Sequence, residues 1–137
     1  TALAGLADPT IYPIDQNTAR FHDRVAYDLN FGGMADDAAE AQRLGGVMAD
    51  KPILLMGNHG VAVAAPTVAE AFEDLYYFER ACKTMILAYA TQQPLSILTD
   101  EIARKVTTSW EAFNGMGPAH LRQQMELLDR DDPPYRD

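Results

Sequence analysis

The segment PILLMGNHGVAVAAP, residues 52–66, constrains the fold more than any other part of the sequence. It contains two short apolar runs, residues 53–56 and 61–64, joined by Gly-Asn-His-Gly. Apolar runs of this length without polar alternation are typical of strands that are buried on both faces. A link of about four residues that is rich in Gly and Asn suits two neighbouring antiparallel strands. We therefore predict a pair of central strands with His59 in the turn between them.

Helical spacing predicts a long helix directly after these strands. Thr67 and Glu70 form a T-x-x-E capping box behind Pro66, and Gln92-Gln93-Pro94 ends the helix. Its apolar residues recur at helical spacing: Val68, Ala71, Phe72, Leu75, Phe78, Cys82, Met85, Ile86 and Tyr89. This pattern predicts one face packed against the strands.

Three further helices are expected over residues 34–49, 99–113 and 118–128. Asp36 or Asp37 can cap the first of them. Gly45 and Gly46 weaken that helix unless they permit close packing.

Residues 25–31 alternate apolar and polar side chains and end at Gly32-Gly33, which predicts a third strand. The first seven residues are compatible with the end of a helix, whereas residues 16–24 are polar and ambiguous. The sequence has no internal repeat and no long linker. We therefore expect a single α/β domain over residues 1–128, followed by a charged tail over residues 129–137.

Composition excludes several classes of function. The 137 residues fit one domain, and a net charge of −9 opposes non-specific binding to nucleic acid or anionic lipid. No apolar run approaches the roughly 20 residues that span a bilayer. A single cysteine, Cys82, excludes an internal disulfide and fits a reducing compartment. No charged and apolar leader opens the chain, so we expect a cytoplasmic protein.

Few residues offer catalytic chemistry. The three histidines are His22, His59 and His120, and no H-x-H, H-E-x-x-H or C-x-x-C pattern announces a zinc site. Neither serine lies in a G-x-S-x-G motif, and no glycine-rich nucleotide-binding motif is present. We expect His22 and His120 at the surface. Cys82 lies on the apolar stripe of the long helix, which favours core packing over reactivity.

His59 differs from the other two histidines because two buried strands fix its backbone. Gly57 and Gly60 flank it closely and leave room for a ligand, and Asn58 can hydrogen-bond the turn or orient the ring. Spacing alone leaves two interpretations open. His59 is either a functional residue or a structural one whose ring nitrogens bond nearby backbone groups.

The same residues resemble the class II aldolase/adducin family. Residues 57–61, GNHGV, resemble the family's N-H-G turn, and residues 66–72 and 76–79 resemble the helix that follows it. The ending over residues 127–135 resembles the tail of bacterial adducin-like members more than the short sugar-phosphate aldolases. The resemblance covers residues 15–137.

This resemblance implies an αβα fold with a central, largely antiparallel sheet, assembled as a homotetramer with sites between subunits. The family's enzymes bind a divalent metal, typically zinc, through an H-x-H pair and the later histidine of N-H-G, which is His59 here. Gly57, Asn58 and Gly60 would shape its turn. The metal polarises the carbonyl group of a small substrate.

The H-x-H pair and the acid/base glutamate of the family are absent from this sequence. The resemblance therefore implies that the chain lacks the N-terminal half of a family domain. We assign no catalytic residue within it, and we expect it to be inactive alone and to bind metal weakly or not at all. The alternative is an adducin-like interaction or assembly module without catalysis; a third is an unrelated protein with a structural His59.

Overall fold

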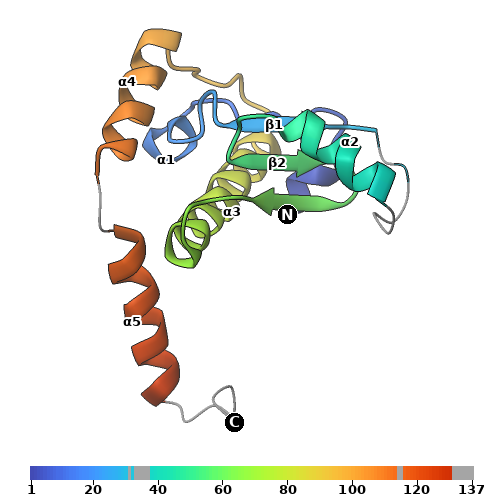
Figure 1. The fold of residues 1–137 in the computed structure, drawn as a ribbon. Coiled ribbons are helices and arrows are strands. Elements are labelled where there is room, and N and C mark those ends of the chain that lie inside the picture. Colours follow the sequence, from blue (N-terminus) through green and yellow to red (C-terminus); the bar gives the residue numbers. More distant parts are fainter. Residues whose placement is uncertain (31, 33–37, 114–115, 131–137) are drawn as a thin grey trace.

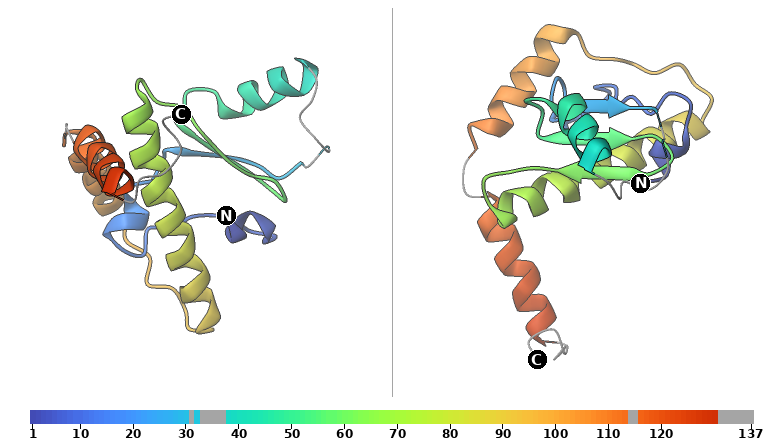
Figure 2. Two further views of the ribbon diagram at one scale, coloured as in Figure 1. Left: turned by 90° about the horizontal axis from the view of Figure 1, so that it is seen from below. Right: turned by 45° about the vertical axis from the view of Figure 1, so that its right-hand side comes forward.

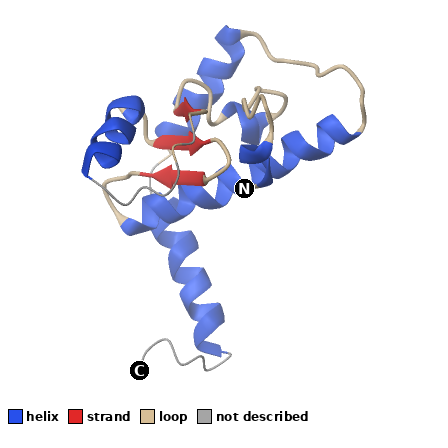
Figure 3. Cartoon of the chain, turned by 90° about the vertical axis from the view of Figure 1, so that its right-hand side faces the viewer, coloured by secondary structure: helices blue, strands red, loops and turns tan. Residues whose placement is uncertain are grey.

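The computed structural model describes residues 1–30, 32, 38–113 and 116–130. A sheet of three strands lies between helix α2 (Ala38–Met48) on one face and the long helix α3 (Val68–Ala90) on the other (Figures 1 and 2). Figure 3 shows the strands at the centre with helices around them. The predicted α/β fold class is confirmed.

The three strands are β1 (Val25–Asp28), β2 (Ile53–Met56) and β3 (Gly60–Val63), in the order β1-β2-β3. Strands β2 and β3 pair antiparallel, with Ile53 opposite Val63 and Met56 opposite Gly60. The predicted hairpin is thus confirmed. Strands β1 and β2 pair parallel. A parallel pair needs a crossover connection, which α2 supplies here.

Strand β2 is buried on both faces, as its sequence predicts. Ile53 and Leu55 belong to the hydrophobic core with residues of α3, whereas Leu54, which points to the other face, is only 3% exposed. Strand β3 is half-buried along its whole length. The expectation of two buried faces was wrong for β3, because within the described sheet it has a neighbour on one side only.

Helix α3 forms as predicted and supplies four of the ten residues of the hydrophobic core cluster, more than any other element. Phe78, Cys82 and Met85 are at most 2% exposed, but Val68 at its start is 78% exposed. Thr67 caps the helix by accepting a hydrogen bond from the backbone N–H of Glu70 at 3.2 Å. The Glu70 carboxylate accepts from the Thr67 hydroxyl at 2.8 Å. The predicted capping box is therefore half formed in the described structure, because the Glu70 carboxylate binds the hydroxyl of Thr67 and not its backbone N–H.

The N-terminal part contains two short helical segments. A 3-10 helix, η1 (Ala2–Gly5), packs Leu3 and Ala4 into the core. Helix α1 (Gln16–Ala19) begins at Asp15, whose carboxylate accepts from the backbone N–H of Thr18 at 2.7 Å. The ambiguous polar segment is therefore helical at its start.

The remaining helices differ from prediction mainly at their ends. Helix α4 (Asp100–Glu111) begins after Thr99, as expected. Helix α5 (Met116–Arg130) is longer than predicted, so Asp129 and Arg130 belong to it and not to a tail. It packs against α3 at its start and then extends away from it (Figures 1 and 3). The predicted tail over residues 131–137 lies outside the described residues.

Helix α2 corresponds to the helix predicted over residues 34–49, of which residues 34–37 lie outside the described part. The proposed caps Asp36 and Asp37 are among these, as is Phe31 of the predicted strand. The suggestion that Gly45 and Gly46 permit close packing was wrong for the described part of the chain, in which a Cβ atom at either position would meet nothing within 4 Å. None of the described helices has the length and apolar character needed to cross a membrane.

Candidate functional site

The turn that carries His59 is tied to two other parts of the chain and is closed by a hydrogen bond of its own. The backbone N–H of Gly57 donates to the carbonyl of Asp28 at the end of β1, at 2.7 Å. The N–H of Asn58 donates to the carbonyl of Ala4 in η1 at 2.8 Å, and that of His59 to the carbonyl of Met56 at 3.2 Å. Three consecutive amide groups are therefore held in place.

The residues on either side of His59 have distinct roles. A side chain at Gly57 would bring a Cβ atom within 3.3 Å of Leu29 Cα, so glycine permits the close approach of the turn to the end of β1. Asn58 has a φ of 56°, a left-handed conformation that asparagine adopts more readily than most residues. A Cβ atom at Gly60 would meet no described residue within 4 Å. Gly57 is thus needed for packing, and the space beside Gly60 is open.

His59 itself is exposed at the surface. Burial of the His59 ring among apolar side chains would have excluded metal binding, but the residue is exposed. An exposed imidazole on a fixed turn is accessible to an ion or to another polypeptide.

An ion pair between the buried Asp28 and the partly exposed Arg43 lies beside this turn. Asp28 is 5% exposed and binds the guanidinium of Arg43 through two contacts, at 2.6 and 3.1 Å. These hydrogen bonds lower the pKa of Asp28 below its usual value. Glu40 bonds the same guanidinium at 2.7 and 2.8 Å. The pair joins α2 to the end of β1, where the Gly57 amide is bound.

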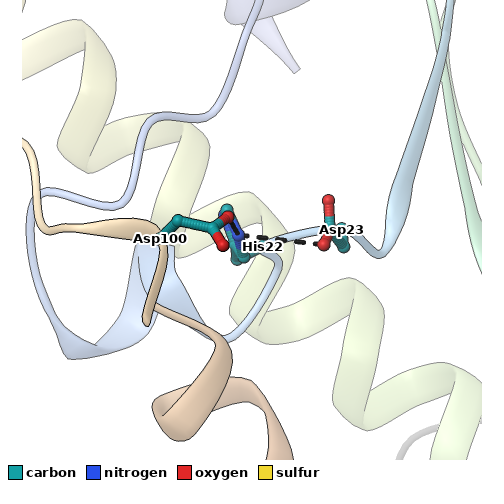
Figure 4. Close-up of side chains that lie close together, drawn as sticks. All are labelled: His22, Asp23 and Asp100. Atoms are coloured by element: carbon teal, nitrogen blue, oxygen red, sulfur yellow. Dashed lines mark hydrogen bonds and ion pairs between the residues drawn. The ribbon is translucent and has the colours of Figure 1, made fainter. Parts of the chain in front are cut away.

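A second group of metal-ligand types lies elsewhere in the chain. Among the described residues, His22, Asp23 and Asp100 form the only set of three such side chains whose ligand atoms lie within 4.8 Å of one another (Figure 4). His22 Nε2 lies 2.9 Å from an oxygen of Asp100 and 3.8 Å from one of Asp23. His22 is thus partly buried and paired, which differs from the simple surface position that we expected.

Arg104 already offsets part of the negative charge of this group. Its guanidinium lies 2.8 Å from Asp23 and 2.8 Å from Asp100, and both carboxylates are more than half exposed. The hydrogen bond from Arg104, followed by that from His22, lowers the pKa of Asp100. A metal ion would have to displace this guanidinium, so we interpret the group as a surface ion-pair cluster.

His120 was expected at the surface and lies instead against α3. Its Nδ1 is 2.6 Å from Oε2 of Glu73, and its ring packs on Tyr76 and Phe72, with centroid distances of 4.5 and 5.0 Å. The charged neighbour Arg122 suggested an exposed position for His120 on the last helix. The close packing of α5 on α3 reverses that expectation, since a Cβ atom on Gly117 would lie 2.9 Å from the carbonyl oxygen of Ala69.

Glu73 belongs to a buried ionic cluster that sequence reasoning missed. Asp74, 7% exposed, lies 2.9 Å from Nη2 of Arg20 and 2.8 Å from Nη2 of Arg24. The Arg20 guanidinium also stacks over the rings of Tyr77 and Trp110, at 4.7 and 4.9 Å from their centroids. A signal was present, because Asp74 lies four residues before Phe78 on the buried face of α3.

Cys82 is a core residue, as predicted. It is 2% exposed, and burial raises the pKa of its thiol to about 11. A thiol in this state is not a nucleophile near neutral pH.

Comparison with known proteins agrees with this architecture. The model of the Class II Aldolase and Adducin N-terminal domain family matches residues 1–86, which include β1 to β3, the His59 turn and most of α3. The chain belongs to this family. The match starts at the first residue, earlier than residue 15, where the resemblance in the sequence becomes evident.

Two curated relatives illustrate the breadth of the family. A protein of Caulobacter vibrioides that is named as a class 2 aldolase protein is 26% identical over 133 residues, which cover 93% of this chain and 50% of the relative. An adducin-related protein of Schizosaccharomyces pombe is 30% identical over 115 residues, which cover 78% of this chain and 36% of the relative. The chain thus spans half or less of the length of these relatives.

Solved structures share the fold. An aldolase II superfamily protein from Pseudomonas syringae superposes with a TM-score of 0.87 and 30% identity, over 99% of this chain and 55% of that one. The L-fuculose 1-phosphate aldolase from Glaciozyma antarctica superposes with a TM-score of 0.65 and 18% identity, over 79% of this chain and 39% of that one. The second likeness concerns the fold alone.

Proposed function

We propose that this chain is one half of a metal-dependent class II aldolase-type lyase that acts on a small carbonyl substrate, and that His59 is a ligand of its divalent metal, zinc in the first instance. The observation that supports this proposal most is the fixed backbone under an exposed imidazole. Gly57 and Asn58 donate backbone hydrogen bonds to two other segments, β1 and η1, and the N–H of His59 closes the turn on Met56. A metal ligand has to be held in this way.

The imidazole of His59 is a suitable ligand for a divalent metal. A neutral imidazole is a preferred ligand of zinc, and a bound divalent metal polarises a carbonyl oxygen as a Lewis acid. A catalytic zinc has three protein ligands and one open position. Among the described residues, no group of three ligand side chains within 4.8 Å includes His59. We therefore propose that the other ligands come from outside the described part, and that the chain alone binds metal weakly and is inactive.

An adducin-like interaction module is the alternative. It is favoured by the adducin-related relative and by the incomplete set of ligands around His59. In this alternative the turn would contact another polypeptide instead of an ion. Metal binding that depends on His59 distinguishes the two.

The experiment is a titration of the chain with Co²⁺, followed by its visible absorption and by the histidine resonances in NMR spectra. The three histidines are each replaced by glutamine. We expect weak binding that His59→Gln removes and that His22→Gln and His120→Gln retain. Binding lost in His22→Gln but retained in His59→Gln would place the ion at the Asp23 and Asp100 carboxylates. Absence of any His59-dependent signal would favour the interaction module.

We also propose that the protein assembles as a homo-oligomer, a tetramer in the first instance. The outer edges of β1 and β3 have no strand partner among the described residues, and such edges promote pairing with another chain. Sedimentation measures the assembly state directly.

A further inference from the structure

A groove of about 630 Å³ lies along the exposed side of α4, beside the start of α1 (Figure 1). Its apolar wall consists of four side chains in or just after α4: Ile102, Val106, Trp110 and Phe113. Gln16 at the start of α1 and Lys105 of α4 add polar groups. We call this site the α4 groove. None of its lining residues belongs to the His59 turn, so it is separate from the proposed metal ligand.

Helix α4 has two faces with different surroundings. Thr107, on the inner face, is 8% exposed and donates a hydrogen bond to the carbonyl of Ala19 at 2.8 Å. Ile102 and Val106 lie one turn apart on another face, where Ile102 is 43% exposed. Phe113, directly after the helix, is 63% exposed. A helix that packs on its own chain through one face needs only one apolar stripe, so the second stripe indicates a surface for another molecule.

The charge of the α4 groove differs from that of the whole chain. The chain has 20 acidic and 11 basic side chains, yet the groove lining, among the described residues, contains one lysine, Lys105, and no carboxylate. Two other cavities of the described structure, of about 300 and 500 Å³, are lined by carboxylates such as Glu73 and Glu79. The α4 groove is therefore a site of local positive charge on an acidic protein, and it fits a ligand with an anionic group.

The carboxylates of α4 do not occupy the ammonium group of Lys105. Asp100 and Glu111 are each paired with an arginine, at 2.8 and 3.5 Å. Glu101 precedes Lys105 by one helical turn, but in the described structure no ion pair within 4 Å joins the two. The Lys105 ammonium group is therefore available to a ligand, and it offers three N–H donors.

We propose that the α4 groove binds an aliphatic carboxylate of medium chain length, with its carboxylate at Lys105 and its hydrocarbon chain along the apolar wall. From Ile102 to Trp110 this wall follows about 12 Å of helix, which suits a chain of about eight carbon atoms. The groove volume lies within the range of small-molecule pockets. The Gln16 amide supplies a further N–H donor in the lining. This inference does not depend on the metal proposal for His59.

The chain contains its own reporter for this site, because Trp110 lines the groove and is the only tryptophan. We would titrate the chain with sodium octanoate and follow the fluorescence and the indole N–H resonance of Trp110. Octan-1-ol, octylammonium chloride, sodium hexanoate and sodium acetate are titrated in parallel, each below the concentration at which it forms micelles. We expect saturable binding of octanoate, about threefold weaker binding of octan-1-ol, and none of acetate or octylammonium. Hexanoate should bind more weakly than octanoate by about two- to fourfold for each CH₂ group removed.

Three variants locate the effect. Ile102→Glu replaces part of the apolar wall by a carboxylate and should abolish saturable binding. This variant should keep α4 intact, because a glutamate three residues after Thr99 completes a capping box. Val68→Glu is the matched control, since it makes the same kind of change in the first turn of α3, at a 78% exposed position outside the groove. Lys105→Gln should remove the preference for octanoate over octan-1-ol.

Several results would overturn the proposal. They are a linear response to octanoate, equal or tighter binding of octan-1-ol or octylammonium, a preference for octanoate that Lys105→Gln retains, and binding that Ile102→Glu retains or Val68→Glu equally removes. Sedimentation of the same samples tests a different occupant. Self-association that Ile102→Glu abolishes, together with no binding of octanoate to the unaltered chain, would identify the groove as a contact between copies and would also overturn the proposal.

Discussion

Replacement of Asp74 by alanine tests the buried ionic cluster. The Asp74 carboxylate accepts hydrogen bonds from two arginines, at 2.9 Å from Arg20 and 2.8 Å from Arg24. The two guanidinium-bearing side chains are only 9% and 16% exposed, so water replaces the lost carboxylate poorly. Asp74→Ala therefore leaves two buried cations without their main partner.

The loss of stability in Asp74→Ala depends on the contacts that Arg20 and Arg24 keep. Removal of one partner from a buried ion pair typically costs about 3–5 kcal/mol. Glu73 stays 3.7 Å from Arg20, and Glu111 stays 3.5 Å from Arg24, so each cation keeps a weaker contact. We expect the lower end of the range, about 3 kcal/mol of the free energy of unfolding. With a urea slope of about 2 kcal/mol/M, the midpoint falls by roughly 1.5 M.

Urea unfolding followed by Trp110 fluorescence and by circular dichroism measures this change. The matched control is Asp100→Ala, which removes an aspartate from an arginine at a similar distance of 2.8 Å, but in an exposed pair. Exposed pairs contribute little, so the control should shift the midpoint far less. Equal midpoints for the two variants would refute the claim that the Asp74 cluster is a buried, stabilising network.

Four further outcomes are expected. Gly117→Ala should destabilise the chain by about 1–3 kcal/mol, because its Cβ would lie 2.9 Å from a backbone oxygen, whereas Gly45→Ala on open α2 should be neutral or stabilising in the same denaturation assay. Cys82 should react slowly with a thiol reagent at pH 8 and rapidly in urea, since burial raises its pKa to about 11; fast native reaction would contradict its burial. Asp28 has a lowered pKa in the folded state, so its contribution to stability is present above its unfolded pKa and is lost as the pH falls through the lower folded value. Asp28→Asn should therefore flatten the acid limb of the stability profile. Sedimentation should show self-association of the chain through its sheet edges, and a clean monomer would contradict that.

The sequence predicted the parts of the fold that local patterns determine. The hairpin around His59 and helix α3 were predicted because two apolar runs, a glycine-rich link and a capped helical stripe all lie close together in the chain. Burial was predicted less well. Strand β3 has the same apolar character as β2, and only the sheet order shows that it is at an edge.

Polar residues in the core were the main omission. Pattern reasoning assigns charged residues to the surface, and Glu73 and Asp74 are buried because their partners come from other elements. Arg20 follows α1 and His120 lies in α5, so no local pattern connects them with α3. For the same reason the sequence placed His22 and His120 at the surface. The cavity of about 300 Å³ that Arg20, Glu73 and Trp110 line was not foreseeable either, since its walls come from six separate segments.

The mixed topology of the sheet has a consequence for how the chain folds. The β2–β3 hairpin closes over the three residues Gly57, Asn58 and His59, whereas the parallel β1–β2 pair requires the chain to pass through α2 first. Short loops close fast and at low entropic cost, so the hairpin should appear early along the folding pathway and the parallel pair later. The loop with the proposed metal ligand would then take shape before its bonds to Asp28 and Ala4 form. The turn itself would therefore form from local interactions, and the hydrogen bonds to Asp28 and Ala4 would fix its position afterwards.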